Sequence, residues 1–190
     1  MTGDHMQRDI LEFWFGPPPL RDRAEWFRKN PAFDGEIRAR FGSAIGRAIA
    51  GGYRDWETTA HGALARVLLL DQFTRNAFRD TPAAFAGDPE ALAAARRAVR
   101  QGFDRALQPV ERQFVYLPYE HAESAAAQDE SLALFGALAR ETNSPGTLEW
   151  AEKHAAIIRR FGRYPHRNAA LGRPSTAEEI AFLREPGSRF

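Results

Sequence analysis

The chain has 190 residues, of which 44% are hydrophobic and 27% charged, and this length and composition suit one globular domain. Its 26 basic and 25 acidic residues nearly cancel, which argues against a chain-wide surface for nucleic acid or anionic membrane. Cysteine is absent, so disulfides, thiolate metal sites and cysteine nucleophiles are excluded. We therefore expect a cytoplasmic protein in a reducing compartment.

No targeting or membrane segment is expected. The N-terminus lacks a basic region followed by an apolar stretch, and the apolar run at 67–70 is far shorter than the roughly 20 residues of a membrane span. Residues 1–6 are expected to be a cloning remnant or a disordered start. The expected organisation is a single all-helical domain over residues 1–190, with its motifs at about 10–183.

Apolar residues recur at intervals of three and four in the first half of the chain, which predicts amphipathic helices. Ile10, Phe13 and Trp14 share one helical face. A second such face is formed by Ile37, Phe41, Ala44, Ile45 and Ala48. The segment 63–78 is apolar on nearly every side, which is typical of a central helix.

Helix boundaries are marked along the second half. Asp88-Pro89-Glu90 predicts an N-cap at Asp88, and Gly102 is expected to end that helix. Pro118 should kink or divide the helical segment 109–128. Leu132, Phe135, Leu138 and Ala139 share a further face, and a helix beginning near Thr147 should end at Gly162. A capping box is expected at Ser175-Thr176-Ala177-Glu178.

These patterns predict an all-α fold of about eight to ten helical elements packed as antiparallel pairs. No repeat near 34 residues stands out, so the pairs could form a degenerate tetratricopeptide-like array or an irregular helical bundle.

The first candidate cluster lies inside the apolar helix at 63–78, where Asp71, Gln72, Arg75 and Asn76 interrupt the hydrophobic pattern. Asp71 and Arg75 are one helical turn apart and can pair. A buried unpaired carboxylate costs several kcal/mol, so partners are expected. The cluster is either a satisfied core network or the floor of a pocket.

The second cluster follows Pro118 and contains Glu120, His121 and Glu123. Glu120 and Glu123 share one helical face, while His121 is rotated by about 100°. Carboxylates with imidazole suit several metals. The helical di-iron and His-Glu-x-x-His spacings are absent, so we expect no metal and no cofactor.

The third cluster is basic, because residues 153–177 contain no acid. Its cations are Lys153, His154, Arg159, Arg160, Arg163, His166, Arg167 and Arg173, and Asn168 lies among them. Cations at a helix C-terminus are favourable, so capping is one role for them. Arginine forks could also hold a phosphate, a carboxylate or a stacked ring. A wide basic face of the kind that nucleic acid needs is missing.

The three clusters complement one another in charge. Asp71 and the acids at 120 and 123 need cations, and the basic segment needs acids. We expect Arg163, His166 and Arg167 to fold back over the helix that carries Asp71 and Arg75, near the helix that carries Glu120.

Several blocks of the sequence together resemble one known family. They are Phe13-Trp14-Phe15-Gly16, Trp26-Phe27, Asp71-Gln72-Phe73-Thr74-Arg75-Asn76, Ala84-Phe85-Ala86-Gly87-Asp88, Glu111-Arg112-Gln113-Phe114, Pro118-Tyr119-Glu120-His121-Ala122-Glu123, the segment 160–168 and Leu171-Gly172-Arg173. The chain resembles, from about residue 10 to 183, the mainly bacterial family catalogued as domain of unknown function 924. The resemblance implies an all-helical, tetratricopeptide-like fold and a family whose activity is not established.

The motif positions of that family coincide with the three clusters, so we take them as candidate ligand-binding residues. They are Asp71, Gln72, Arg75, Asn76, Glu120, His121, Glu123, His154, Arg163, His166, Arg167 and Asn168. The resemblance assigns no catalytic residue.

Three functions remain open at this point. The first, which we favour, is a binding module for a small anionic ligand or a peptide carboxylate. The second is an enzyme with His121 or His166 as general base and Glu120 or Glu123 as its orienting acid. The third is a structural or oligomer-forming protein, with Trp14, Trp26, Phe27 and Phe33 partly exposed to a partner, although such aromatics are more often core. Homo-oligomers are compatible with all three, and nucleic acid and membrane are not expected as partners.

Overall fold

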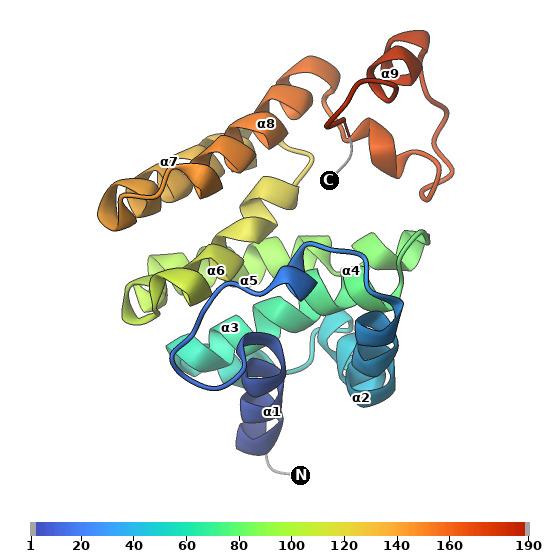
Figure 1. The fold of residues 1–190 in the computed structure, drawn as a ribbon. Coiled ribbons are helices and arrows are strands. Elements are labelled where there is room, and N and C mark those ends of the chain that lie inside the picture. Colours follow the sequence, from blue (N-terminus) through green and yellow to red (C-terminus); the bar gives the residue numbers. More distant parts are fainter. Residues whose placement is uncertain (1–2, 189–190) are drawn as a thin grey trace.

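The structure, a computed structural model, describes residues 3–188, which contain helices and no strand (Figure 1). The α-helices are α1 (Gly3–Phe15), α2 (Pro31–Ile49), α3 (Ala60–Leu68), α4 (Thr74–Ala77), α5 (Asp88–Arg100), α6 (Pro109–His121), α7 (Ala125–Thr142), α8 (Gly146–Phe161) and α9 (Ala177–Phe182). A π-helical turn, η3 (Leu69–Phe73), joins α3 to α4. Single 3₁₀ turns are η1 (Ala24–Trp26), η2 (Arg54–Thr58), η4 (Pro82–Phe85), η5 (Phe103–Ala106) and η6 (Pro165–Arg167). The all-α prediction is confirmed.

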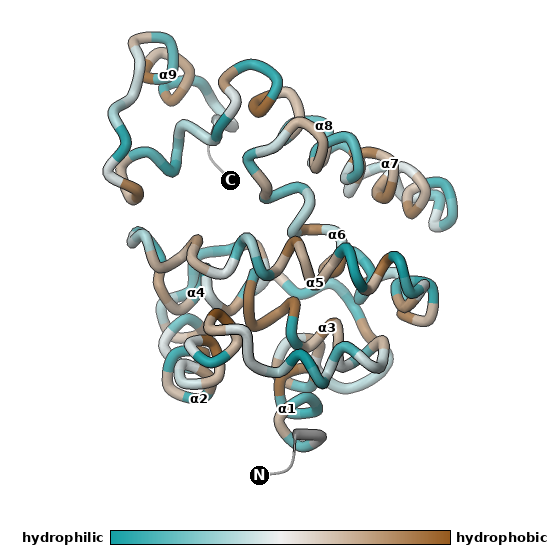
Figure 2. The backbone as a smooth tube through the Cα atoms, turned by 180° about the vertical axis from the view of Figure 1, so that it is seen from behind, coloured by the Kyte–Doolittle hydropathy of each residue, from teal (hydrophilic) through white to brown (hydrophobic). Residues whose placement is uncertain are grey.

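The main core surrounds the continuous helix α3–η3–α4, as the apolar run at 63–78 predicts. In Figure 2 a strongly hydrophobic stretch lies near the middle of the fold, where this helix runs. Trp14 of α1 is fully buried, and its ring lies 5.4 Å from Phe73 and 5.5 Å from Phe114 of α6. Truncating a core aromatic of this kind costs about 3–5 kcal/mol. The predicted inward face of α2 is also buried.

The C-terminal half is built on an antiparallel helix pair. Only residues 143–145 separate α7 from α8, and the two helices pack side by side, with α6 against α7 (Figure 1). Gly162 follows α8 in a left-handed conformation, with φ of +70°, as predicted. A small second core then fastens the following segment, because Tyr164 packs with Ile157 and Ile158 of α8.

Several predicted boundaries are wrong in detail. Asp88 is the first residue of α5 and does not cap it with its side chain, since Gly87 is the N-cap residue and the Asp88 carboxylate binds arginines. The capping box lies one residue later than expected, with Thr176 and Glu179 as its two members. Either neighbouring residue could begin the motif, because both 175 and 176 carry a hydroxyl and both are followed three residues later by an acid.

Pro118 neither divides α6 nor ends it, and the break predicted there falls at 122–124. The helix continues through the proline because its flanking residues Val115, Leu117 and Tyr119 are buried, and this packing outweighs the lost backbone hydrogen bond. At the N-terminus, α1 begins at Gly3, within the residues 1–6 for which the sequence predicted a cloning remnant or a disordered start, and residues 1–2 lie outside the described range.

Within residues 3–188, none of the helices combines the length and the apolar character that a membrane span requires. The tetratricopeptide-like arrangement stays a prediction. What the fold does establish is that η3, the start of α5, the end of α6 and the segment after α8 meet in one place.

Candidate functional site

The site begins at the π-helical turn η3, which lies inside the central helix. A π turn adds one residue to a helical turn and is frequent at functional sites. The Thr74 hydroxyl donates a hydrogen bond to the Leu69 carbonyl, five residues earlier, at 2.8 Å and so supports the widened turn. Asp71 and Gln72 lie within this turn, which no sequence pattern predicted.

Asp71 is fully buried and is the hub of the cluster. Its Oδ1 accepts hydrogen bonds from Arg75 Nη1 at 2.8 Å and from His121 Nδ1 at 2.7 Å, and its Oδ2 accepts from Gln72 Nε2 at 2.6 Å. Burial alone would raise the pKa of Asp71, but the charge of Arg75 and the contact with His121 hold that pKa well below its ordinary value. Asp71 is therefore a carboxylate at neutral pH, as its predicted pairing with Arg75 requires.

The ionised state of Asp71 fixes the tautomer of His121, the last residue of α6. A carboxylate only accepts hydrogen bonds, so Nδ1 of His121 carries the proton. Burial lowers the pKa of His121, as does the charge of Arg75, and Asp71 offsets part of this, so the ring is neutral at pH 7. No hydrogen bond joins Nε2 to any described residue, and 15% of the side chain is exposed. The lone pair of Nε2 is thus open to a ligand or to water.

Two arginines converge on Asp88 at the start of α5. Arg75 Nη1 and Nη2 lie 2.9 and 3.0 Å from the two Asp88 oxygens, and Arg167 Nη1 lies 3.1 Å from Oδ2. Arg167 also donates from Nη2 to the His121 carbonyl at 3.0 Å. The predicted folding back of the basic segment over the helix of Asp71 is thus seen for Arg167.

Arg167 is held between two aromatic rings. Its guanidinium carbon lies 4.7 Å from the ring centroid of Phe85 and 4.5 Å from that of Tyr164, at distances typical of cation–π contacts. The residue is buried, and its Nε has no hydrogen-bond partner among the described residues. Burial lowers the pKa of Arg167, and the charge of Arg75 lowers it further, although Asp88 opposes both. Arg167 is therefore incompletely paired for a buried cation.

Asp88 reaches the arginines because Gly87 approaches the π turn closely. A Cβ at Gly87 would lie 2.0 Å from the Leu70 carbonyl oxygen, nearer than any real contact. Only glycine fits there, and the next residue then enters α5 with its carboxylate toward Arg75. The sequence carried this signal in the Gly87-Asp88 block, but the capping pattern suggested a local role for the acid.

Glu120 and His154 form a second buried pair behind His121. His154 Nδ1 lies 3.1 Å from Glu120 Oε1 and 2.9 Å from the Trp150 carbonyl, and its ring centroid lies 6.2 Å from that of His121. Burial and the charge of Asp71 raise the pKa of Glu120 to about 8, while burial and His121 lower the pKa of His154 to about 3. Both groups are consequently neutral at pH 7, and this is a neutral contact rather than an ion pair.

The end of α6 is capped by side chains from α7 and from the segment after α8. Gln128 Nε2 donates to the carbonyls of residues 119, 120 and 122, and the Tyr164 hydroxyl donates to the Glu120 carbonyl at 2.5 Å. This cap holds His121 and Glu120 in place. Burial and Arg167 lower the pKa of His166, whose ring lies 5.5 Å from that of Tyr164, to about 4.

The remaining predicted residues lie away from the hub. Glu123 accepts two hydrogen bonds from Arg173, at 2.6 and 2.9 Å, and one from the Tyr164 backbone. Arg163 binds Glu179 of α9 at 2.7 Å, so it is not brought to Asp71 as we expected. Asn168 contacts Ser175, and Asn76 contacts Asp34 of α2. The predicted acid partner of His121 is also wrong, because Asp71 and not Glu120 or Glu123 orients the ring.

Sequence reasoning missed three members of the site. Asp88, Phe85 and Tyr164 were not among the candidate ligand-binding residues, although each lies in a quoted block. Among the described residues, no group of three or more histidine, aspartate or glutamate side chains is arranged to hold a metal ion.

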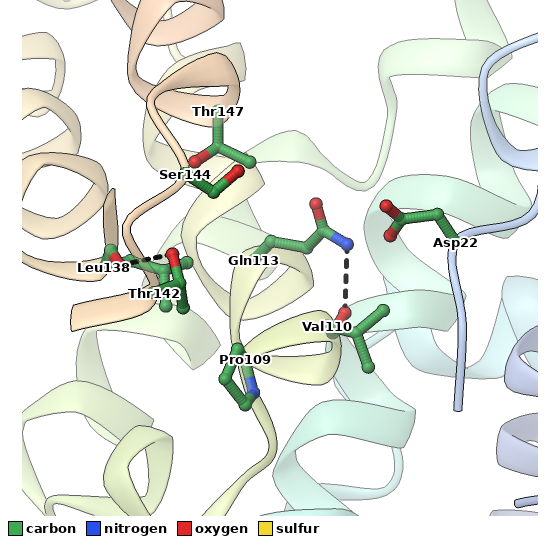
Figure 3. A pocket seen from close by; sticks show the side chains of 8 residues that line it. All are labelled: Asp22, Pro109, Val110, Gln113, Leu138, Thr142, Ser144 and Thr147. Carbon is green, nitrogen blue, oxygen red and sulfur yellow. Dashed lines mark hydrogen bonds between the residues drawn. The ribbon is translucent and has the colours of Figure 1, made fainter. Parts of the chain in front are cut away.

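Two surface hollows lie elsewhere. One, of about 160 Å³, is lined by Asp22, Pro109, Val110, Gln113, Leu138, Thr142, Ser144 and Thr147 (Figure 3). In it Gln113 and Thr142 donate to nearby backbone carbonyls, of Val110 and Leu138, and no cation faces the cavity. The other, of about 360 Å³, is lined by Ala24, Glu25, Arg28, Lys29, Asn30 and Pro31. Neither hollow is lined by a buried ionisable cluster.

Comparisons with known proteins agree with this fold. Residues 10–187 match a family described as bacterial protein of unknown function (DUF924). A solved structure of a protein of unknown function from Agrobacterium tumefaciens is similar, with 39% sequence identity and a TM-score of 0.85. The similarity covers 95% of this chain and 98% of that one. No curated protein matches the sequence.

Proposed function

The chain belongs to the bacterial family of unknown function DUF924, and we propose that it binds a small anion through Arg75 and Arg167. The ligand group is a carboxylate or a phosphate, on a small molecule or at the end of a peptide. One observation carries the proposal: two guanidiniums converge on a single carboxylate, of Asp88, while Arg167 Nε stays buried and unpartnered among the described residues. Most buried donors in folded proteins are paired, so an unpaired Nε on a buried arginine that lies beside a second guanidinium supports a place for an anion.

The surroundings of the two arginines favour negative charge. The pKa of His166 is lowered by burial and by Arg167, and the pKa of His121 is lowered by burial and by Arg75. The part of each shift that comes from Arg75 or Arg167 reflects positive charge, which also attracts an anion, while Asp71 and Glu123 offset part of that charge. The neutral His121 ring can in addition accept a hydrogen bond at Nε2 from a protonated group of the ligand.

Asp88 occupies the place that the ligand takes. Its side chain is 19% exposed and lies in the first turn of α5, so a rotation about its side-chain bonds can free both guanidiniums for an incoming anion. The Arg75 side chain, which contacts Asp88, is 17% exposed. The carboxylate therefore acts as an internal competitor, and its removal should tighten anion binding.

The other two functions have different support. The enzyme alternative depends on His121, whose ring is oriented by Asp71. The scaffold alternative loses most of its surface, because Trp14, Trp26 and Phe33 are buried in the core and only Phe27 of that set is exposed. A cytosolic location, which the absence of cysteine favours, is part of the proposal.

The test is calorimetric titration with sodium phosphate and sodium acetate at constant ionic strength, with sodium chloride as the blank. We expect a saturable site with Kd near or below about 1 mM, equivalent to about 4 kcal/mol of binding free energy. Arg167→Gln should abolish it. Arg159→Gln, which removes an arginine paired with Asp129 on the surface, should leave it unchanged. Asp88→Asn should bind phosphate more tightly than the wild type.

The outcomes separate a site from a structural network. If the wild type shows no more heat with phosphate or acetate than with chloride, the proposal is wrong and the arginines serve only the fold. If Arg167→Gln does not fold, the Asp88→Asn comparison still decides, because unchanged or weaker phosphate binding contradicts internal competition.

A further inference from the structure

Asp71 and His121 have the geometry of a base held by a carboxylate. The contact from His121 Nδ1 to Asp71 Oδ1 is 2.7 Å, and Asp71 is itself fixed by Gln72 and Arg75. The opposite ring nitrogen, Nε2, has no hydrogen bond to a described residue, and the ring is partly exposed. An imidazole oriented through Nδ1 with its Nε2 open is arranged to take a proton from a bound molecule.

The cations lie next to this base. Arg167 donates to the carbonyl of His121 itself, and Arg75 shares Oδ1 of Asp71 with the imidazole. A substrate whose anionic group binds these guanidiniums is thereby held at the histidine. No described hydroxyl or amine side chain is hydrogen-bonded to His121, so the base acts on water rather than on a side-chain nucleophile.

We propose that His121 is the catalytic general base, and Asp71 its positioning residue, for the hydrolysis of a small carboxylic ester that carries an anionic group. This inference rests on the proposed function, because Arg75 and Arg167 bind that anionic group. Base-promoted attack of water at an acyl carbon needs only a base and stabilisation of negative charge, and the cluster contains both.

The step balances without another reactant. His121 Nε2 accepts a proton from water as the water oxygen bonds to the acyl carbon, and the carbonyl electron pair moves onto oxygen. A guanidinium stabilises the charge on that oxygen. When the carbonyl re-forms, the bond from the acyl carbon to the leaving oxygen breaks, and the imidazolium returns its proton to that oxygen. The products are an alcohol and a carboxylic acid, which loses its proton to solvent.

The charged surroundings keep the base ready at neutral pH. The titratable and charged groups that face His121 are Asp71 of η3, Arg75 of α4, His154 of α8, and Arg167 and His166 in or beside η6. Burial and Arg75 lower the pKa of His121, so its free base persists below pH 6.5. The hydrolysis rate should therefore stay constant through neutrality and fall only at a more acidic pH.

The experiment compares two chromogenic esters of matched shape, mono-4-nitrophenyl terephthalate, which is anionic, and 4-nitrophenyl benzoate, whose acyl group is neutral. We expect kcat/KM at least about 10-fold higher for the anionic ester. His121→Gln should lose about 100-fold or more, in line with the usual contribution of a general base. His61→Gln, in which the exposed histidine beside Glu111 is replaced, should match the wild type.

The pH dependence of hydrolysis by Asp71→Asn distinguishes a role of Asp71 in positioning His121 from a merely structural role. Asp71 raises the pKa of His121, so its loss should both slow the reaction and move the acidic limb to lower pH. A variant that is merely less stable would be slower with an unmoved limb. If Asp71→Asn does not fold, the comparison of His121→Gln with His61→Gln still decides.

Failure of catalysis and failure of binding give different results. If phosphate and acetate bind through Arg167 while neither ester is hydrolysed faster by the wild type than by His121→Gln, the catalytic inference is overturned and the binding function stands. If phosphate and acetate also fail to bind, both proposals are overturned.

Discussion

Replacing Glu120 by glutamine tests whether this buried carboxyl is neutral in the folded protein. Its pKa rises from an ordinary 4.5 to about 8 through burial and the charge of Asp71. Between these values the unfolded chain releases a proton that the folded chain retains, so stability falls as pH rises. The loss is about 1.4 kcal/mol per pH unit, or about 3 kcal/mol at pH 7 and at most about 5 kcal/mol above pH 8.

Glutamine has the shape of the protonated acid and does not titrate, so Glu120→Gln should escape this loss. Any change in the contact with His154 has the same effect at both pH values. The difference between the stability changes at the two pH values therefore reports only the proton that Glu120 retains on folding. We expect the free energy of unfolding of Glu120→Gln, relative to wild type, to rise by about 3–4 kcal/mol from pH 5 to pH 8.

The assay is urea unfolding followed by far-ultraviolet circular dichroism at pH 5 and pH 8. Glu152→Gln, which removes an exposed carboxyl of the neighbouring helix α8, is the control for loss of charge. An equal effect of Glu120→Gln on the free energy of unfolding at the two pH values would refute the reasoning. So would a stability of the variant, relative to wild type, that is lower at pH 8 than at pH 5.

Three further predictions concern the supports of the site. Gly87→Ala should lower the free energy of unfolding in urea by about 1–3 kcal/mol, because its Cβ would meet the Leu70 carbonyl oxygen. The control Gly42→Ala, which has open space around it, should raise that free energy by up to about 1 kcal/mol, and equal effects of the two variants would contradict the close approach at Gly87. The pKa of His166 falls from 6.5 to about 4 on folding, so the unfolded chain takes up a proton first and the free energy of unfolding drops as pH falls from 6.5 to 4. His166→Gln should remove up to about 3 kcal/mol of this drop, and a variant whose stability changes with pH as the wild type's does would refute the prediction. Arg163→Gln should lower the urea midpoint through the lost contact with Glu179 and leave phosphate binding unchanged; weaker phosphate binding would place Arg163 in the site.

The helices were predictable because their signals are local. The apolar run at 63–78 and the spacing of Asp71 and Arg75 are properties of one helix, so both the buried helix and its ion pair follow from sequence alone. Where two local signals competed, the sequence could not choose. The capping box at residues 175–179 is such a case, because adjacent hydroxyl residues offered two registers.

The site was predictable in its members more than in its pairings. The need of Asp71 for cations and of the basic segment for acids correctly brought Arg167 and His121 together with it. The partner of His121 was missed because it lies 50 residues away, and sequence neighbours looked nearer. Asp88 was missed for the opposite reason, since a sound local role as N-cap concealed a tertiary one.

The central claim is that Arg75 and Arg167 bind an anion, and the Nε–H resonances of the arginines report on it most directly. In a nitrogen-15 NMR titration with sodium phosphate at constant ionic strength, the account predicts that the Arg167 Nε–H signal shifts and saturates, because that donor is unpartnered in the free protein. The Arg159 signal should stay in place. A stationary Arg167 signal, or one that drifts linearly with all the others, would contradict the account.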